Sequence, residues 1–353
     1  MGSMKYSITD MGIVCALGAD RKTVLERMLA GDTSGMKKLT GLTAGDETVF
    51  GFAPGWGPQR PPELAEGETR VGALVDRAMS QLGLEALFRE VPHERVGAVI
   101  GTSNSTMEEF TDNPDRIDMA FPAEHIRDKW GVKGPVWSVS TACSSSAKVF
   151  ASARRLLDLG ICDAVIVGGA DAYTRTVVEG FHSLEALSSK LCRPCSPNRD
   201  GINLGEGAAL FVLRRGEAEG GVRLLGVGES SDAHHLTAPD PEGKGAEASM
   251  RAALADAALS PREINFVNLH GTGTVYNDSM ELAAVERVFG KDVCRTSTKP
   301  FTGHCLGAAG AVEAALCCLR LLALPSSPTP TRCLSNSFAF GGSNASVILA
   351  RDI

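Results

Sequence analysis

Short apolar segments alternate with helical segments along most of this chain, and this alternation restricts the fold more than any other feature. The continuous apolar run at 164–169 is typical of a buried strand in a largely parallel sheet. In the segment 70–89, apolar residues recur at spacings of three and four, which predicts an amphipathic helix. A chain of 353 residues is also too long for one small core. We therefore expect an α/β fold, built from two core units or one large domain.

Two stretches of the chain share the same order of predicted elements. The first runs from Val136 through Ser-Thr-Ala-Cys into a helix that ends in Arg155-Leu-Leu. The second runs from Val293 through Ser-Thr-Lys and Gly-His-Cys-Leu-Gly into a helix that ends in Arg320-Leu-Leu. Each stretch reads as a strand, a turn of small residues and a helix. Two related halves would explain this likeness, but so would a chance similarity between two βα units.

Charge and apolar composition exclude two classes of protein. A net charge of −7, without a long basic run, argues against a nucleic-acid surface. The longest apolar stretch, 308–324, contains Glu313 and Arg320, so we expect a buried helix there and no membrane span. Ten scattered cysteines and no recognisable secretory leader are typical of a cytoplasmic protein with free thiols.

Cys143 is the candidate nucleophile, within Ser-Thr-Ala-Cys-Ser-Ser-Ser at 140–146. A predicted strand enters this turn and a predicted helix leaves it. Unpaired backbone N–H groups and the helix dipole at such a place favour the thiolate, and the small neighbours would let a substrate approach. Taken alone, the pattern fits a buried, unreactive cysteine better, because most cytosolic cysteines are of that kind.

Two histidines are candidates for the same site. His270 follows a predicted strand and opens His-Gly-Thr-Gly-Thr, where active sites of α/β folds form. His304 lies at the predicted start of the last long helix, where a neutral imidazole is expected. Two neutral imidazoles that donate N–H bonds to one oxygen would suit an enolate, although either histidine could simply cap a turn.

Charged residues near the histidines have two possible roles. Lys299, Asp278, Glu281 and Glu313 could set the protonation and orientation of the imidazoles, or they could form surface ion pairs. The spacing of Cys192 and Cys195 fits a metal or redox motif, but a second pair of ligands is missing, so we expect no metal there.

Eight motifs in this order resemble those of the β-ketoacyl synthases, specifically the elongating class that acts on acyl carrier protein. The resemblance covers nearly the whole chain, from Ile8 to Leu349. The motifs are Thr-Ala-Cys-Ser-Ser at 141–145, Gly-Gly-Ala at 168–170, Cys-Arg-Pro…Asn-Arg-Asp-Gly at 192–201, Gly-Glu-Gly-Ala at 205–208, His-Gly-Thr-Gly-Thr at 270–274, Ser-Thr-Lys at 297–299, Gly-His-Cys-Leu-Gly-Ala-Ala-Gly at 303–310 and Asn-Ser-Phe-Ala-Phe-Gly-Gly-Ser-Asn at 336–344.

The resemblance implies the thiolase fold, with two related α/β halves in a five-layered α-β-α-β-α arrangement. We place the N-terminal half, with the nucleophile, at 1–220 and the C-terminal half, with both histidines, at 221–353. Chain-starting relatives would usually carry His and Asn instead of two histidines. A thiolase would carry a second catalytic cysteine near its end, which the C-terminal Phe-Gly-Gly-Ser motif lacks.

The resemblance also implies a decarboxylative Claisen condensation. Cys143 would take an acyl group from acyl carrier protein, and His270 and His304 would stabilise the enolate of malonyl-acyl carrier protein. Thr272 and Thr274 match positions that bind the phosphopantetheine arm, which the carrier protein supplies, so no metal or redox cofactor is expected. Lys299 and Glu313 match a supporting ion pair. Phe340 matches a gate, and its N–H would share an oxyanion hole with that of Cys143.

Several positions depart from the family pattern. Ala339 stands before the gate where relatives usually have glycine, and Cys195-Ser196 replaces a common Phe-Asp pair. The chain is an unusually short member, with segments trimmed between Ser105 and Trp130 and between Leu324 and Asn336. Pocket length and oligomer geometry are therefore open.

Two other functions and two oligomeric states remain possible from the sequence. The chain could be a non-catalytic chain-length partner of a synthase, or a cysteine-dependent acyltransferase or hydrolase. A homodimer is expected, with a heterodimer containing a synthase-like subunit as the alternative. Arg127, Lys129 and Lys133 are candidates for docking of the acidic carrier protein, or are ordinary solvated charges.

Overall fold

A computed structural model describes residues 6–42, 46–109, 115, 117–216, 221–323 and 332–351. The strands are β1 Tyr6–Val14, β2 Met36–Leu39, β3 Thr48–Gly51, β4 Val96–Gly101, β5 Val136–Val139, β6 Ala164–Asp171, β7 Leu204–Gly205, β8 Gly207–Arg215, β9 Val222–Ser231, β10 Phe266–Asn268, β11 Cys294–Thr296, β12 Arg332–Phe338 and β13 Ser343–Arg351. The α-helices are α1 Arg21–Leu29, α2 Arg70–Met79, α3 Leu84–Glu90, α4 Phe121–Trp130, α5 Ser145–Asp158, α6 Arg175–Ser183, α7 Lys244–Asp256, α8 Val275–Phe289, α9 Lys299–Thr302 and α10 Ala309–Ala323.

Strand order shows that the fold is an internal repeat. The first half orders its strands β5-β4-β6-β8-β1, and the second half orders its strands β11-β10-β12-β13-β9. In both halves the first three strands of this order run parallel to one another, and each of the last two runs antiparallel to the strand before it. β1 and β9 pair and join the halves into one ten-stranded sheet. Two related halves, and not a chance likeness of two βα units, therefore explain the sequence similarity.

The division that we predicted at 220/221 is not settled by this topology. It falls next to residues 217–220, which lie outside the described residues, just before β9 begins at Val222. The exact boundary therefore stays a prediction.

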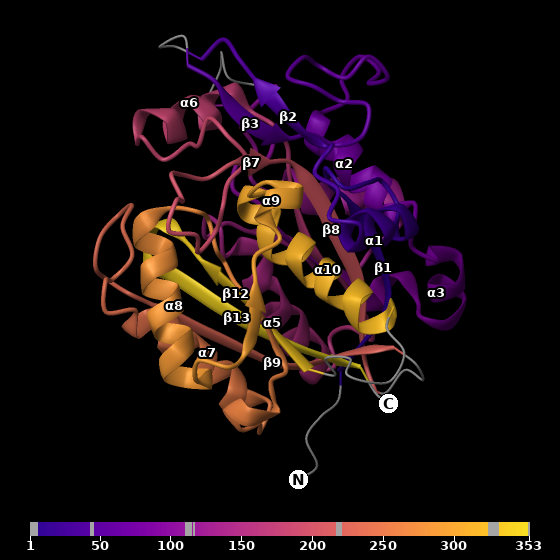
Figure 1. The fold of residues 1–353 in the computed structure, drawn as a ribbon. Coiled ribbons are helices and arrows are strands. Elements are labelled where there is room, and N and C mark those ends of the chain that lie inside the picture. Colours follow the sequence, from indigo (N-terminus) through magenta and orange to yellow (C-terminus); the bar gives the residue numbers. More distant parts are fainter. Residues whose placement is uncertain are drawn as a thin grey trace.

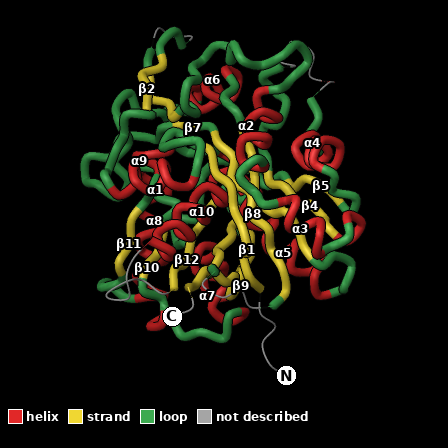
Figure 2. Tube along the Cα trace, turned by 90° about the vertical axis from the view of Figure 1, so that its right-hand side faces the viewer, coloured by secondary structure: helices red, strands yellow, loops and turns green. Residues whose placement is uncertain are grey.

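Helices α5 and α10 form the central layer of the molecule (Figure 1). They pack against each other, and both contact strands of the two halves, so the sheet strands enclose them from either side. α2 and α4 cover the outer face of the first half, while α7 covers the second half and packs against α8. Figure 2 shows the strands of both halves between helices. This is the predicted order of five layers.

The central position of α10 explains why this helix is almost entirely apolar. Leu306–Ala323 is long and apolar enough to cross a membrane, but 83% of this window is buried inside the protein. A helix that is covered on all sides by protein must be apolar around its whole circumference.

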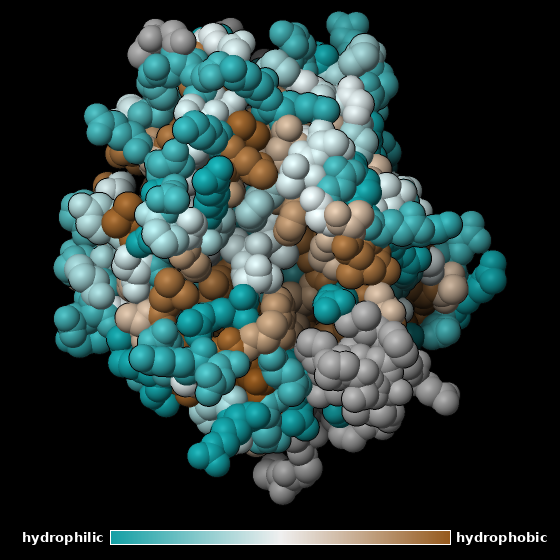
Figure 3. Space-filling view, viewed as in Figure 1, coloured by the Kyte–Doolittle hydropathy of each residue, from teal (hydrophilic) through white to brown (hydrophobic). Residues whose placement is uncertain are grey.

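On the face shown in Figure 3, hydrophilic side chains predominate and apolar ones gather in separate patches.

Helix boundaries differ from the prediction at two places, and the second of these matters for the site. The segment 70–89 forms two helices, α2 and α3, and not one. The helix expected from Gly303 begins only at Ala309, after the short α9. Gly303 has φ 70° and Leu306 has φ 52°, and such left-handed residues cannot continue an α-helix. His304 therefore lies in a turn between two helices.

The Gly, Pro and charged residues of segment 35–68 predict a loop without regular structure. It contains the short strands β2 and β3, which pair with each other and with β7 in a small separate sheet. These strands are only four residues long, and the Gly, Pro and charged residues around them hid their pattern in the sequence.

Substitution of Gly101 tests how closely α5 packs against β4. A Cβ atom at Gly101 would lie 2.3 Å from the Ser146 nitrogen and 2.5 Å from its Cα, both in the first turn of α5. We expect Gly101→Ala to lower the free energy of unfolding by about 1–3 kcal/mol, since the helix backbone must move. Denaturant titration checks this value.

The matched control for this substitution is Gly180→Ala in α6. A Cβ atom there meets no heavy atom within 4 Å, and alanine is the better helix former. Its stability should stay the same or rise slightly. Equal stability of the two variants would show that α5 is loosely seated.

Candidate active site

Cys143 lies in the turn between β5 and α5. Ala142, directly before it, has φ 51°, a left-handed conformation that costs energy for a residue with a side chain. The Ser145 hydroxyl accepts a hydrogen bond from the Thr141 N–H and donates one to the Ala142 carbonyl oxygen, which supports this turn. The thiol is therefore held at the start of the central helix, 7% exposed.

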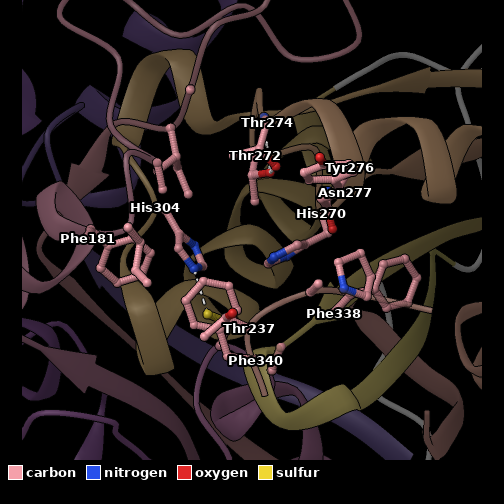
Figure 4. A pocket seen from close by; sticks show the side chains of 18 of the residues that line it. Phe181, Thr237, His270, Thr272, Thr274, Tyr276, Asn277, His304, Phe338 and Phe340 are labelled. Carbon is pink, nitrogen blue, oxygen red and sulfur yellow. Dashed lines mark hydrogen bonds between the residues drawn. The ribbon is translucent and has the colours of Figure 1, made fainter. Parts of the chain in front are cut away.

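Both histidines converge on this thiol. The His304 Nε2 atom lies 2.9 Å from the Cys143 sulfur, and the sulfur and one ring nitrogen of each histidine lie within 4.8 Å of one another. The two imidazole rings are nearly perpendicular, with centroids 5.2 Å apart, and point to a common space (Figure 4). The predicted trio of Cys143, His270 and His304 is thus brought together, from three different loops.

The internal repeat explains this convergence. Cys143 follows β5, and His304 follows β11, which is the equivalent strand of the second half. Each residue precedes one of the two central helices, α5 and α10. Because these helices pack against each other, the two turns meet at one end of the central layer.

The protonation state of Cys143 differs from the sequence prediction. Burial raises the pKa of the Cys143 thiol to about 12, and the smaller, opposing effects come from the Lys299 charge and the Phe340 N–H. We expected the helix N-terminus to favour the thiolate, and that expectation is wrong, because desolvation outweighs it. The resting nucleophile is a thiol, with His304 Nε2 positioned to accept its proton.

Both imidazoles are neutral, as expected for His304. Burial and then the nearby Lys299 charge hold the pKa of His304 and of His270 well below the usual value. Burial is the main cause for each, and it applies to a histidine in a turn as well as to one at a helix start. Neutral rings can donate N–H bonds to a developing negative oxygen without protonating it.

Lys299 and Glu313 form an ion pair beneath the histidines. The Lys299 Nζ and Glu313 Oε1 atoms are 2.5 Å apart, and both side chains are buried. Lys299 also donates to the carbonyl oxygen of His270. The lysine therefore holds the backbone that carries one imidazole and places a positive charge beside both.

Glu281 and Asp278 orient the loop of His270 and do not form surface ion pairs. Glu281 accepts hydrogen bonds of 2.8 Å from the backbone N–H groups of His270 and Gly271. Asp278 accepts from the N–H groups of Gly273 and Cys195. Burial raises the pKa of Glu281 to about 7. These carboxyl groups act on the backbone and make no contact with the imidazole nitrogens.

Asp171 is a supporting residue that the sequence analysis missed. Its carboxylate lies at the end of β6 and accepts hydrogen bonds from the Thr102 hydroxyl, the Ser103 N–H and the Gly307 N–H, the last at 2.6 Å. It thereby ties the ends of two strands of the first half to the turn that follows His304. Its position after Gly-Gly-Ala at a strand end was a signal that could have identified it.

A pocket of about 360 Å³ connects this site to the surface. Cys143, His270 and His304 line its inner end, and the predicted binding residues Thr272 and Thr274 line its wall. The hydroxyl oxygens of the two threonines are 2.9 Å apart. Figure 4 shows both threonine side chains beside the histidines.

Phe340, the predicted gate, also lines the pocket. The residue is 38% exposed, and its ring stacks on Phe181 of α6, with centroids 5.5 Å apart. Its backbone N–H and that of Cys143 lie close enough to the sulfur to lower the thiol pKa. Both N–H groups therefore face the sulfur, and their role as an oxyanion hole stays a prediction.

Ala339 does not strain the gate turn. Its φ of −110° is an extended conformation that any residue adopts. The left-handed positions are Gly341, with φ 77°, and Gly342, with φ 74°, so glycine occupies the positions that need it. The departure at Ala339 has no cost in this conformation.

Lys299→Ala tests the buried ion pair. Removing the cation leaves the Glu313 carboxylate buried without a counter-charge, and we expect a loss of about 3–5 kcal/mol in the free energy of unfolding. Adding Glu313→Gln should restore part of the stability, because the remaining group is neutral. Chemical denaturation of the single and double variants measures both effects, and a single variant as stable as the wild type would contradict the pairing.

Comparison with known proteins agrees with this geometry. Family models described as the β-ketoacyl synthase N-terminal domain and C-terminal domain match residues 72–219 and 222–327. Nodulation protein E of Rhizobium leguminosarum bv. trifolii is 33% identical, over 96% of this chain and 97% of that protein. The 3-oxoacyl-[acyl-carrier-protein] synthase 2 of Staphylococcus aureus (strain COL) is 30% identical, over 98% of this chain and 97% of that protein.

Solved structures show the same fold. The structure of the ketosynthase ApeO in complex with its chain length factor ApeC, from Xenorhabdus doucetiae, contains a chain 36% identical to this one, with a TM-score of 0.91 over 99% of this chain and 98% of that chain. A β-ketoacyl synthase from Burkholderia phymatum STM815 is 26% identical, with a TM-score of 0.85 over 99% of this chain and 100% of that chain.

The comparison also agrees with the expectation that this chain is a short member of the family. The alignment with nodulation protein E runs over 392 positions, whereas this chain has 353 residues, so the relative carries segments that are absent here. The segments judged to be trimmed include residues 110–114 and 324–331, which lie outside the described residues. By domain matches, identity over nearly the whole length, and fold, this chain belongs to the β-ketoacyl synthase family.

Proposed function

We propose that this protein condenses an acyl group, held on Cys143, with malonyl-acyl carrier protein, with loss of carbon dioxide, to give a β-ketoacyl-acyl carrier protein. The observation that carries the proposal is the convergence of one thiol and two neutral imidazoles at the inner end of an open pocket. The relatives named as 3-oxoacyl-[acyl-carrier-protein] synthases support it.

The first half-reaction is acyl transfer to Cys143. His304 Nε2 accepts the thiol proton while the sulfur attacks the thioester carbonyl carbon. The carbonyl oxygen gains negative charge and accepts hydrogen bonds from the N–H groups of Cys143 and Phe340. The carrier thiol then leaves and takes the proton from His304, which returns the imidazole to its neutral form.

The second half-reaction forms the carbon–carbon bond. His270 and His304 each donate an N–H bond to the thioester oxygen of the malonyl group, for which the His304 ring proton must move from Nδ1 to Nε2 after acylation, and carbon dioxide leaves with an enolate remaining. The enolate carbon attacks the acyl-Cys143 carbonyl, and the sulfur leaves as the thiolate, which takes up a proton from water. Because both histidines resist protonation, they stabilise the enolate without quenching it.

Substrates would arrive on the phosphopantetheine arm of the carrier protein, and the enzyme itself needs no cofactor. The hydroxyl groups of Thr272 and Thr274 on the pocket wall would bind the amides of this arm. Acyl chain length and the choice between fatty-acid and polyketide or polyene biosynthesis depend on contacts with a bound acyl chain.

A chain-length partner without catalytic activity fits the site less well. Such subunits normally lose the nucleophilic cysteine, whereas Cys143 is present here and contacts His304. A cysteine hydrolase or acyltransferase would use the same thiol with one histidine. It gives no role to the second imidazole, and its products would contain no new carbon–carbon bond.

A second subunit and a cytoplasmic location complete the proposal. Among the described residues β5 pairs only with β4, so its outer edge is free to pair with a strand of another subunit. That subunit is a second copy or a chain-length factor, as in the ApeO complex. The ten cysteines are all free thiols, which suits a reducing compartment.

The carrier protein would dock at the mouth of the pocket and not on α4. The three cations proposed from the sequence already have carboxylate partners: Arg127 pairs with Glu124 and Asp128, Lys129 with Asp76, and Lys133 with Glu94. Lys190 and Arg193 are exposed and have no ion-pair partner among the described residues. The backbone of Arg193 lies beside Gly273, between the two pocket threonines.

Charge reversal distinguishes the two docking surfaces. Arg193→Glu should raise the KM for the acidic carrier protein roughly fivefold, for about 1 kcal/mol of lost attraction, and the effect should shrink at high salt. The same change at Arg127 serves as the matched control and should leave KM unchanged. Steady-state kinetics at two ionic strengths measure both. If only Arg127→Glu raises KM, the carrier protein docks on α4.

Substitution of Cys143 tests the reaction itself. Cys143→Ala should abolish condensation, because no thioester forms on the enzyme, while Cys143→Gln should release carbon dioxide from malonyl-acyl carrier protein without condensation. Mass spectrometry detects the acyl adduct on the wild-type protein, and carbon dioxide release reports decarboxylation. Wild-type protein that neither becomes acylated at Cys143 nor decarboxylates the malonyl group would exclude the proposed function.

A further inference from the structure

The catalytic trio is also a set of metal ligands. Cys143, His270 and His304 place one sulfur and two ring nitrogens within 4.8 Å of one another, and they are the only such group among the described residues. Thiolate and imidazole are the ligands that Zn²⁺ prefers, and three protein ligands with one open position are typical of accessible zinc sites. We propose that this trio binds Zn²⁺ reversibly and that the bound ion inhibits the enzyme.

Distances in the site allow a tetrahedral ion with small movements. Bonds of about 2.0–2.3 Å from Zn²⁺ place neighbouring ligand atoms about 3.3–3.6 Å apart. The His304 nitrogen and the Cys143 sulfur are at 2.9 Å in their hydrogen bond, and the remaining pairs lie within 4.8 Å. Side-chain shifts of about 1 Å therefore suffice. The fourth position faces the pocket and is open to water.

Charge in the site is compatible with a cation. Both imidazoles are neutral, so protons do not compete for their nitrogens. The thiol must lose its proton on binding, and each bound ion therefore releases one proton to solvent. The positive charge of Lys299 opposes the ion, but Glu313 neutralises it at 2.5 Å.

The surroundings of the histidines limit the affinity. The Nδ1 atoms of His270 and His304 have no hydrogen-bond partner among the described residues. Histidines that bind a metal normally donate their other N–H to a partner, and loss of such a partner weakens binding by about 10–100-fold. The site should therefore exchange Zn²⁺ with solvent and not retain it as a resident ion.

Acylation and metal binding exclude each other at this site. A thioester on Cys143 removes the thiolate ligand, and bound Zn²⁺ in turn removes the nucleophile. Inhibition should therefore act on the free enzyme and spare the acyl-enzyme. The inhibitory role depends on the proposed function, while the binding site itself does not.

Cobalt absorption tests the site without any assay of activity. Co²⁺ added to the purified, metal-free protein should give a thiolate charge-transfer band and strong tetrahedral bands, with one ion per chain, and Zn²⁺ should remove them. Alkylation of Cys143 with iodoacetamide should abolish the bands, and His304→Asn should weaken them. Cys294→Ser, at an exposed thiol, is the matched control and should bind Co²⁺ like the wild type. Bands that survive alkylation of Cys143, or that disappear in Cys294→Ser, would overturn the site.

Condensation in buffered Zn²⁺ tests the inhibition. Free Zn²⁺ at ten times its Kd should lower the rate about tenfold, and EDTA should restore it. Acylation before Zn²⁺ is added should protect the first turnover. Zinc binding without loss of rate would overturn the inhibitory role. Absence of condensation in metal-free protein would refute the proposed function, while the cobalt spectra would still decide the site.

Discussion

The buried ion pair between Lys299 and Glu313 is the interaction on which the rest of the site depends. Lys299 lies on the short helix α9 and Glu313 on the central helix α10, so the pair joins two elements on either side of His304. Lys299 also holds the carbonyl oxygen of His270. Lys299 therefore holds the loop of one imidazole, and its charge adds to burial, the main cause, in keeping both rings neutral. Burying such a pair costs desolvation energy. Its contacts with the segments that carry both histidines explain why the pair is buried despite this cost.

Internal symmetry of the fold supplies the remaining geometry. The nucleophile and one histidine occupy turns before α5 and α10, the equivalent helices of the two halves, whose packing in the central layer brings the turns together. Asp171 fastens this junction, because its carboxylate bridges two strand ends of the first half and the turn after His304. The same convergence that makes a condensing site also makes a thiol–imidazole set with the chemistry of a zinc site.

The sequence by itself determined the family and predicted the reacting residues. Cys143, His270 and His304 were identified through the resemblance of their ordered motifs to those of β-ketoacyl synthases, because the local pattern alone left unreactive roles open for each. The alternation of strands and helices gave the α/β class, and the likeness of two βα units indicated the repeat that strand order then confirmed. Local patterns carry this information because strands, helices and tight turns are specified mostly by neighbours in the chain.

Only the tertiary structure decided how these groups are charged and what holds them. Cys143 was expected as a thiolate from its place before a helix, but burial keeps it a thiol, since desolvation depends on all the protein packed around the sulfur. Arg127 seemed available for docking, whereas its charge is already paired. Asp171 was overlooked, because its partners lie on segments distant in sequence. The charge state of a group, its ion pairs and the hydrogen bonds that hold it all depend on residues that are close in space. The linear sequence does not show which residues these are.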